Sequence, residues 1–109
     1  MSFDQGVAQR VREEITQLPE VEEKKMFGGV GFMLSGNMAC GVINEDLIVR
    51  VGADNYQNAL AAPHTREFDM TGRPMTGWVV VRPDGYRRDE DLRGWVERGV
   101  TFASSLPAK

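Results

Sequence analysis

The feature that most constrains the fold of this chain is a glycine-rich apolar stretch from Lys25 to Met38. Glycines at positions 28, 29 and 31 interrupt its first half, and Ser35-Gly36-Asn37 interrupts its second half. Glycines inside a strand indicate a bulge or a sharp bend, and Ser-Gly-Asn between two apolar runs indicates a hairpin turn. The stretch therefore predicts a strand over about 25–34 that pairs antiparallel with a second strand over 38–43.

Further apolar runs continue this alternation of strands and turns. Residues 47–51, 67–70 and 77–82 are bounded by the turn residues at 44–46, 71–74 and 83–85. Residues 20–24 are acidic and polar and are predicted to be a loop. Since short turns join antiparallel neighbours, we expect one antiparallel sheet of five strands.

Helical periodicity appears at both ends of the chain and once in the middle. An apolar stripe that starts at Phe3 recurs every three or four residues to Leu18, with a capping box at Ser2 and a stop at Pro19. Asp54 begins a short helix that Pro63 ends, and the last helix runs from about Asp89 to Pro107.

Two glycines, Gly94 and Gly99, lie inside the predicted last helix, where each costs about 1 kcal/mol relative to alanine. They indicate close packing against the sheet or a partner helix, or else a kinked helix. The expected element order is α-β-β-β-α-β-β-α. We therefore predict an α+β fold with helices packed on one sheet face, in a single domain over residues 1–109.

Composition argues against most enzyme classes and against a metal site. Cys40 is the only cysteine and His64 the only histidine, so an internal disulfide and a Cys/His zinc site are excluded. Cys40 lies in an apolar run and is predicted to be buried and inert. The glycines at 28–31 lead into a hairpin and not into a helix, so they do not predict a phosphate loop. The sequence thus predicts a non-enzyme without metal or cofactor.

Charge and hydropathy narrow the expected partners and compartment. The net charge of −3 has the wrong sign for a protein that binds nucleic acid directly. No apolar run approaches the ~20 residues of a membrane-spanning helix, and the first residues lack the pattern of a signal peptide. We expect a cytoplasmic protein that does not bind membranes.

Three residues form the candidate binding site. Arg50 interrupts an apolar strand, Arg73 lies in a rigid Gly-Arg-Pro turn, and Trp78 begins the next strand. Guanidinium groups at a sheet edge can bind carboxylate or phosphate in bidentate fashion. The alternative is that these arginines form internal ion pairs, with Asp69 or a glutamate.

Three motifs resemble those of the TfoX/Sxy N-terminal domain family: KMFGGVGF at 25–32, DLIVRVG at 46–52 and FDMTGRPM at 68–75. The resemblance implies an α+β domain with a five-stranded antiparallel sheet, similar to the secretion-chaperone-like fold. It also implies kinship with regulators of bacterial competence, which act with the transcription machinery and carry a second, helical domain. This chain ends where that domain would begin, so we expect a stand-alone N-terminal domain. The family offers no catalytic residues.

Together these points predict a non-enzymatic interaction domain, accessory to transcriptional regulation of competence-type genes, that works through a protein partner of unknown identity. The alternative is a small-ligand or anion-binding module that uses Arg50, Arg73 and Trp78. Large apolar residues in the first half, Met33 and Met38 among them, alternate between both sheet faces. Since one helical layer covers one face, we also expect a symmetric homodimer.

Overall fold

Six strands form one fully antiparallel sheet in the computed structural model, which describes residues 3–15, 21–26, 28–69 and 72–107. The strand order across the sheet is β1-β2-β3-β4-β6-β5. The strands are β1 (Val21–Met26), β2 (Gly29–Leu34), β3 (Asn37–Ile43), β4 (Asp46–Arg50), β5 (Thr65–Glu67) and β6 (Trp78–Val81).

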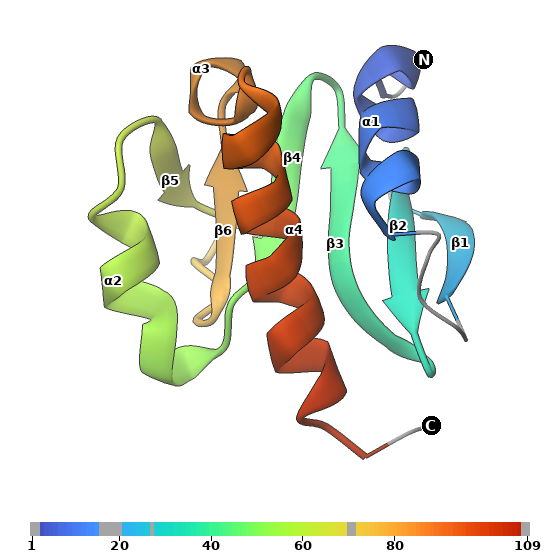
Figure 1. Cartoon of the computed structure of the whole chain (residues 1–109). Coiled ribbons are helices and arrows are strands. Elements are labelled where there is room, and N and C mark those ends of the chain that lie inside the picture. Colours follow the sequence, from blue (N-terminus) through green and yellow to red (C-terminus); the bar gives the residue numbers. More distant parts are fainter. Residues whose placement is uncertain (1–2, 16–20, 27, 70–71, 108–109) are drawn as a thin grey trace.

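The helices lie together on one face of this sheet (Figure 1). They are α1 (Gln5–Ile15), the 3-10 turn η1 (Ala53–Asn55), α2 (Tyr56–Leu60), α3 (Pro83–Tyr86) and α4 (Asp89–Ser104). α4 crosses β3 and β4, α1 lies beside it towards β2, and α2 lies near β5 and β6 (Figure 1). The prediction of an antiparallel sheet with helices packed on it is confirmed.

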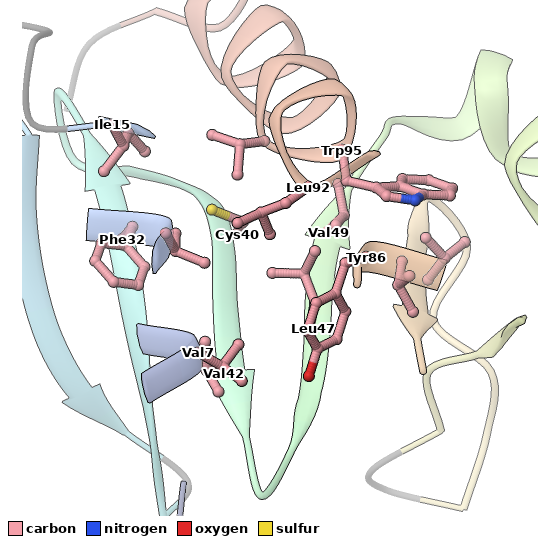
Figure 2. Packing of buried hydrophobic residues seen from close by; sticks show 14 of the residues in the cluster. Val7, Ile15, Phe32, Cys40, Val42, Leu47, Val49, Tyr86, Leu92 and Trp95 are labelled. Carbon is pink, nitrogen blue, oxygen red and sulfur yellow. The ribbon is translucent and has the colours of Figure 1, made fainter. Parts of the chain in front are cut away.

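The core fills the space between the sheet and these helices. Alternate strand residues point into it, among them Phe32, Cys40, Val42, Leu47 and Val49, which are fully buried (Figure 2). Leu92 and Trp95 of α4 meet them from the helical side. The intervening strand residues therefore face the opposite side of the sheet, which we call the helix-free face.

The sheet has six strands, so the prediction of five is wrong. The expected strand over 25–34 divides between two strands, β1 and β2, and Gly28, which precedes β2, has a turn conformation with φ 75°. The expected loop at 20–24 belongs largely to β1, whose Glu22, Glu23, Lys24 and Lys25 mask its strand character. A charged edge strand is a common defence against aggregation, which explains the polar sequence.

The hairpin that joins β2 to β3 is confirmed at Ser35-Gly36. Both residues have positive φ, 51° and 86°, as the tight turns of hairpins require. The register then shifts between Phe32 and Met33: Phe32 pairs with Cys40 but Met33 pairs with Met38. Ala39 is left without a partner on β2, so β3 carries a bulge there.

Helix α1 begins after Asp4 and not after Ser2. The Asp4 carboxylate accepts hydrogen bonds from the main-chain N–H groups of Gly6 (2.8 Å) and Val7 (3.1 Å), which makes it the cap of the helix. The predicted capping residue Ser2 and the predicted end at Leu18 and Pro19 lie outside the described residues. Residues 83–85, expected to be a turn, belong to the single-turn helix α3 (Pro83–Tyr86).

The two glycines of α4 differ in their surroundings. A methyl group at Gly99 would lie 2.3 Å from the main-chain oxygen of Ala39, so the close packing predicted for this glycine is confirmed. No atom lies within 4 Å of the corresponding position at Gly94. Gly94 therefore does not serve helix–sheet packing.

Candidate functional site

Arg50 and Trp78 are direct cross-strand partners at the end of the β4–β6 ladder. The guanidinium carbon of Arg50 lies 5.1 Å from the centre of the Trp78 ring and 5.2 Å from that of Phe102 on α4. Both distances are within the range of cation–π attraction. Strand pairing thus joins two of the three predicted site residues, and α4 adds an aromatic ring that sequence periodicity places only as a buried helix residue.

No carboxylate pairs with Arg50 among the described residues. Asp69, the partner that the alternative interpretation offered, lies instead 4.0 Å from Arg66. Most other arginines of the described chain form ion pairs, such as Arg82 with Asp46 at 2.8 Å and Arg93 with Glu14 at 3.2 Å. Aromatic rings therefore orient the half-buried Arg50 side chain. Its guanidinium N–H groups donate no hydrogen bond to any residue that the structure describes.

Trp78 has a further aromatic neighbour in Phe68. Their ring centres are 6.2 Å apart with planes tilted by 45°, a common geometry for aromatic pairs. Main-chain hydrogen bonds fasten the loop that joins β5 to β6, from Met75 N to Phe68 O (2.9 Å) and from Trp78 N to Met75 O (3.0 Å). The loop therefore holds Phe68 beside Trp78 at this end of the sheet.

Arg73 does not join this cluster. It is exposed in the same loop, next to Gly72 with φ 86°, and among the described residues it makes no ion pair or ring contact. The structure therefore brings together Arg50 and Trp78 and leaves Arg73 apart from them. Phe68 and Phe102 are the neighbours that sequence reasoning missed.

The helix-free face continues from Arg50 and Trp78 across the middle of the sheet. Ile48 and Val80 lie on this face. Together with Arg66 and Phe68 they line a small cavity of about 160 Å³. Met33, Met38 and Ile43 are half-buried, and the end of the Met38 side chain lies against Gly41. This face combines apolar side chains with one oriented, unpaired arginine.

The nucleophile and the base that enzymes would need are far apart. Cys40 is completely buried on β3, and burial raises the pKa of its thiol to about 12. His64 precedes β5, three strands away in the sheet order, or roughly 14 Å at the usual strand spacing. Across the described ranges no three His, Cys, Asp or Glu side chains form a group that could hold a metal ion.

Comparison with known proteins identifies one family. The model of the TfoX N-terminal domain matches residues 13–103 of the chain. No curated protein and no solved structure matches the chain. Within the part of the chain that the structure describes, no helix is long and apolar enough to span a membrane.

Proposed function

Because the chain belongs to the TfoX N-terminal domain family, we propose that it is a non-enzymatic interaction domain that acts through a protein partner. Its role in this proposal is accessory to the transcriptional regulation of competence-type genes. The contact surface is the helix-free face of the sheet, where Met33 and Met38 on β2 and β3 lie at the same end of the strands as Arg50 and Trp78 on β4 and β6.

The observation that carries this proposal is the unpaired Arg50 guanidinium beside the Trp78 ring. Tryptophan and arginine are enriched among the residues that dominate binding energy in protein interfaces. Because aromatic rings already orient Arg50, little side-chain entropy is lost when a partner binds it. An aspartate or glutamate of the partner would supply the carboxylate that Arg50 lacks.

The neighbouring apolar side chains fit the same role. Met33, Met38 and Ile43 are half-buried on the helix-free face, since the helices that the structure describes lie on the other face of the sheet (Figure 1). Methionine adapts its shape readily to different partner surfaces. The buried, protonated Cys40 and its separation from His64 are in keeping with the absence of catalysis. The proposal therefore needs only surface complementarity and no reaction chemistry.

Affinity capture from the native host tests this proposal. Immobilised protein is compared with two variants, Met33→Glu on the helix-free face and Gln57→Glu on α2, which add the same charge. We expect a component of the transcription machinery that the original protein and Gln57→Glu retain and that Met33→Glu loses. Retention of the same proteins by both variants would contradict the proposal.

The unpaired arginine also favours a second candidate function, the binding of a small anion at Arg50 and Trp78. Here the ligand's carboxylate or phosphate would replace that of a protein partner. Calorimetric titration with acetate and inorganic phosphate distinguishes the two, because this candidate predicts binding that Arg50→Gln abolishes. Arg73 has no part in it, so Arg73→Gln serves as the matched control.

A further inference from the structure

A cavity of about 450 Å³ lies on the other side of the sheet, between α2 and α4. Its volume falls within the range of small-ligand sites. Val51 and Phe102 contribute apolar surface, and Asn55, Asn58, Arg98 and Thr101 contribute polar groups. The family assignment and the proposed interaction surface leave this cavity without a role.

The charge of the cavity wall is positive. Arg98 is its charged residue, and no aspartate or glutamate contributes to the lining. Asp54 and Glu97 are chain neighbours of lining residues but are themselves exposed outside it. Arg50 adds a second positive charge close by, since its guanidinium lies 5.2 Å from the Phe102 ring.

Arg98 is held in position by contacts that leave most of its hydrogen-bond donors unused. Its guanidinium carbon lies 4.7 Å from the centre of the Trp95 ring, and Nη2 donates a hydrogen bond to Oδ1 of Asn58 at 3.0 Å. Stacking occupies the flat face of the guanidinium, whereas its N–H groups point outwards in the plane. Among the described residues no carboxylate pairs with it.

The neighbouring polar groups add both donors and acceptors. Because Asn58 uses its carbonyl oxygen for Arg98, its NH₂ group is the part that remains available. The hydroxyl of Ser105 donates to the main-chain oxygen of Phe102 at 2.6 Å, and the NH₂ group of Asn55 donates to that of Val51 at 3.4 Å, so these two side chains present their oxygens. The charged guanidinium of Arg98 and the NH₂ group of Asn58, next to the apolar surface of Val51 and Phe102, are complementary to an oxyanion attached to an apolar group.

We infer that the cavity between α2 and α4 binds a small organic anion. The carboxylate or phosphate of the ligand accepts hydrogen bonds from Arg98 and Asn58, and its apolar body lies on Phe102 and Val51. Phe102 borders both this site and Arg50, but the polar ligand contacts here are Arg98 and Asn58, whereas those of the proposed interaction surface are Arg50 and Trp78. Different variants therefore test the two proposals.

Titration with four probes, followed by NMR, tests the inference. Benzoate and phenyl phosphate carry both an oxyanion and an apolar body, inorganic phosphate carries the oxyanion alone, and benzyl alcohol carries the body alone. We expect benzoate or phenyl phosphate to shift the indole N–H signal of Trp95 and the main-chain signals of residues 98–105 at millimolar concentration. Whichever of these two binds more tightly shows whether the site prefers a carboxylate or a phosphate. Inorganic phosphate and benzyl alcohol should each bind more weakly than that compound.

Variants locate the site and separate binding from folding. Arg98→Gln should weaken the better probe at least about tenfold, as the loss of a charge-assisted hydrogen bond requires. Arg93→Gln removes the same charge from the same helix, where Arg93 contacts Glu14, and should bind normally. Thr101→Trp fills the cavity and keeps Arg98, so it should also abolish binding while the melting temperature stays near that of the original protein.

Three results would overturn the inference. They are the absence of any shift with all four probes, equal weakening by Arg98→Gln and Arg93→Gln, and unchanged binding by a correctly folded Thr101→Trp variant.

Discussion

The main-chain oxygen of Ala39 lies directly against Gly99 of α4, so close that a methyl group on the glycine would be 2.3 Å from it. Ala39 is the bulged residue of β3, without a partner on β2. Helix and sheet therefore touch backbone to backbone at this point. The contact brings Leu92 and Trp95, earlier on the same helix, into the core.

This contact predicts opposite effects for two glycine substitutions in one helix. Gly99→Ala should lower the free energy of unfolding by about 1–3 kcal/mol, because β3 or α4 must move to admit the methyl group. Gly94→Ala meets no atom within 4 Å and should raise it by about 1 kcal/mol through better helix propensity. Urea unfolding monitored by circular dichroism measures both, and a stable Gly99→Ala variant would contradict the packing described above.

Stability should decline at alkaline pH because of two buried groups. Burial raises the pKa of the Cys40 thiol from 9.0 to about 12. Burial, together with the nearby carboxylates of Asp4, Glu45 and Asp46, raises that of the Tyr86 hydroxyl from 10.0 to about 12. Between these values the unfolded chain releases protons that the folded chain retains, so the free energy of unfolding falls as the pH rises.

The stabilising contribution of these groups is thus complete below about pH 9 and is lost towards pH 12. Chemical unfolding at a series of pH values measures the decline. Tyr86→Phe should make it shallower above pH 10, the unperturbed pKa of the tyrosine. A stability that is flat across this window would show that both groups ionise alike in the folded and unfolded chain.

The helix-free face should also support self-association. Met33 and Met38 are cross-strand partners there, and a symmetric dimer would cover them. Light scattering at high micromolar concentration should give the mass of a dimer, and Met33→Glu should shift it towards the monomer. Gln57→Glu adds the same charge on α2, away from this face, and serves as the control. A monomeric original protein would rule out this dimer.

Binding to random duplex DNA should be weak at physiological salt. Non-specific affinity grows with the number of phosphates that basic residues neutralise. The chain has a net charge of −3, and many of its arginines already pair with carboxylates, for example Arg10 with Asp89. A mobility shift at submicromolar protein and ordinary salt would contradict this expectation.

The sequence predicts those elements whose signals are local. Asp89 starts α4 as predicted, because acidic residues are favoured in the first turn of a helix. Ser35-Gly36 forms the predicted hairpin turn, because turn residues determine the local backbone conformation. The sequence does not predict β1, because the charged residues of VEEKKM are typical of a loop. They suit a strand only at the edge of a sheet, and that position follows from the tertiary structure.

The same distinction applies to the candidate sites. Arg50 and Trp78 were both identified from the strands that carry them, and their pairing follows from the order of β4 and β6 in the sheet. Phe102 reaches Arg50 from a helix more than forty residues later, which no periodicity encodes. The cavity beside Arg98 likewise depends on how α2 and α4 sit relative to one another.

Helix α4 follows along the chain the strands that it covers, which has a consequence during synthesis on the ribosome. β1 to β4 are consecutive along the chain and complete at Arg50, whereas the helix that covers β3 and β4 begins at Asp89. At about 5–20 residues per second, the roughly 40 residues in between take about 2–8 s to translate. During that interval Val42 and Val49 belong to a nascent chain that lacks α4, the helix that covers β3 and β4. Newly made chains are therefore open to chaperones, or to one another, until their last helix emerges.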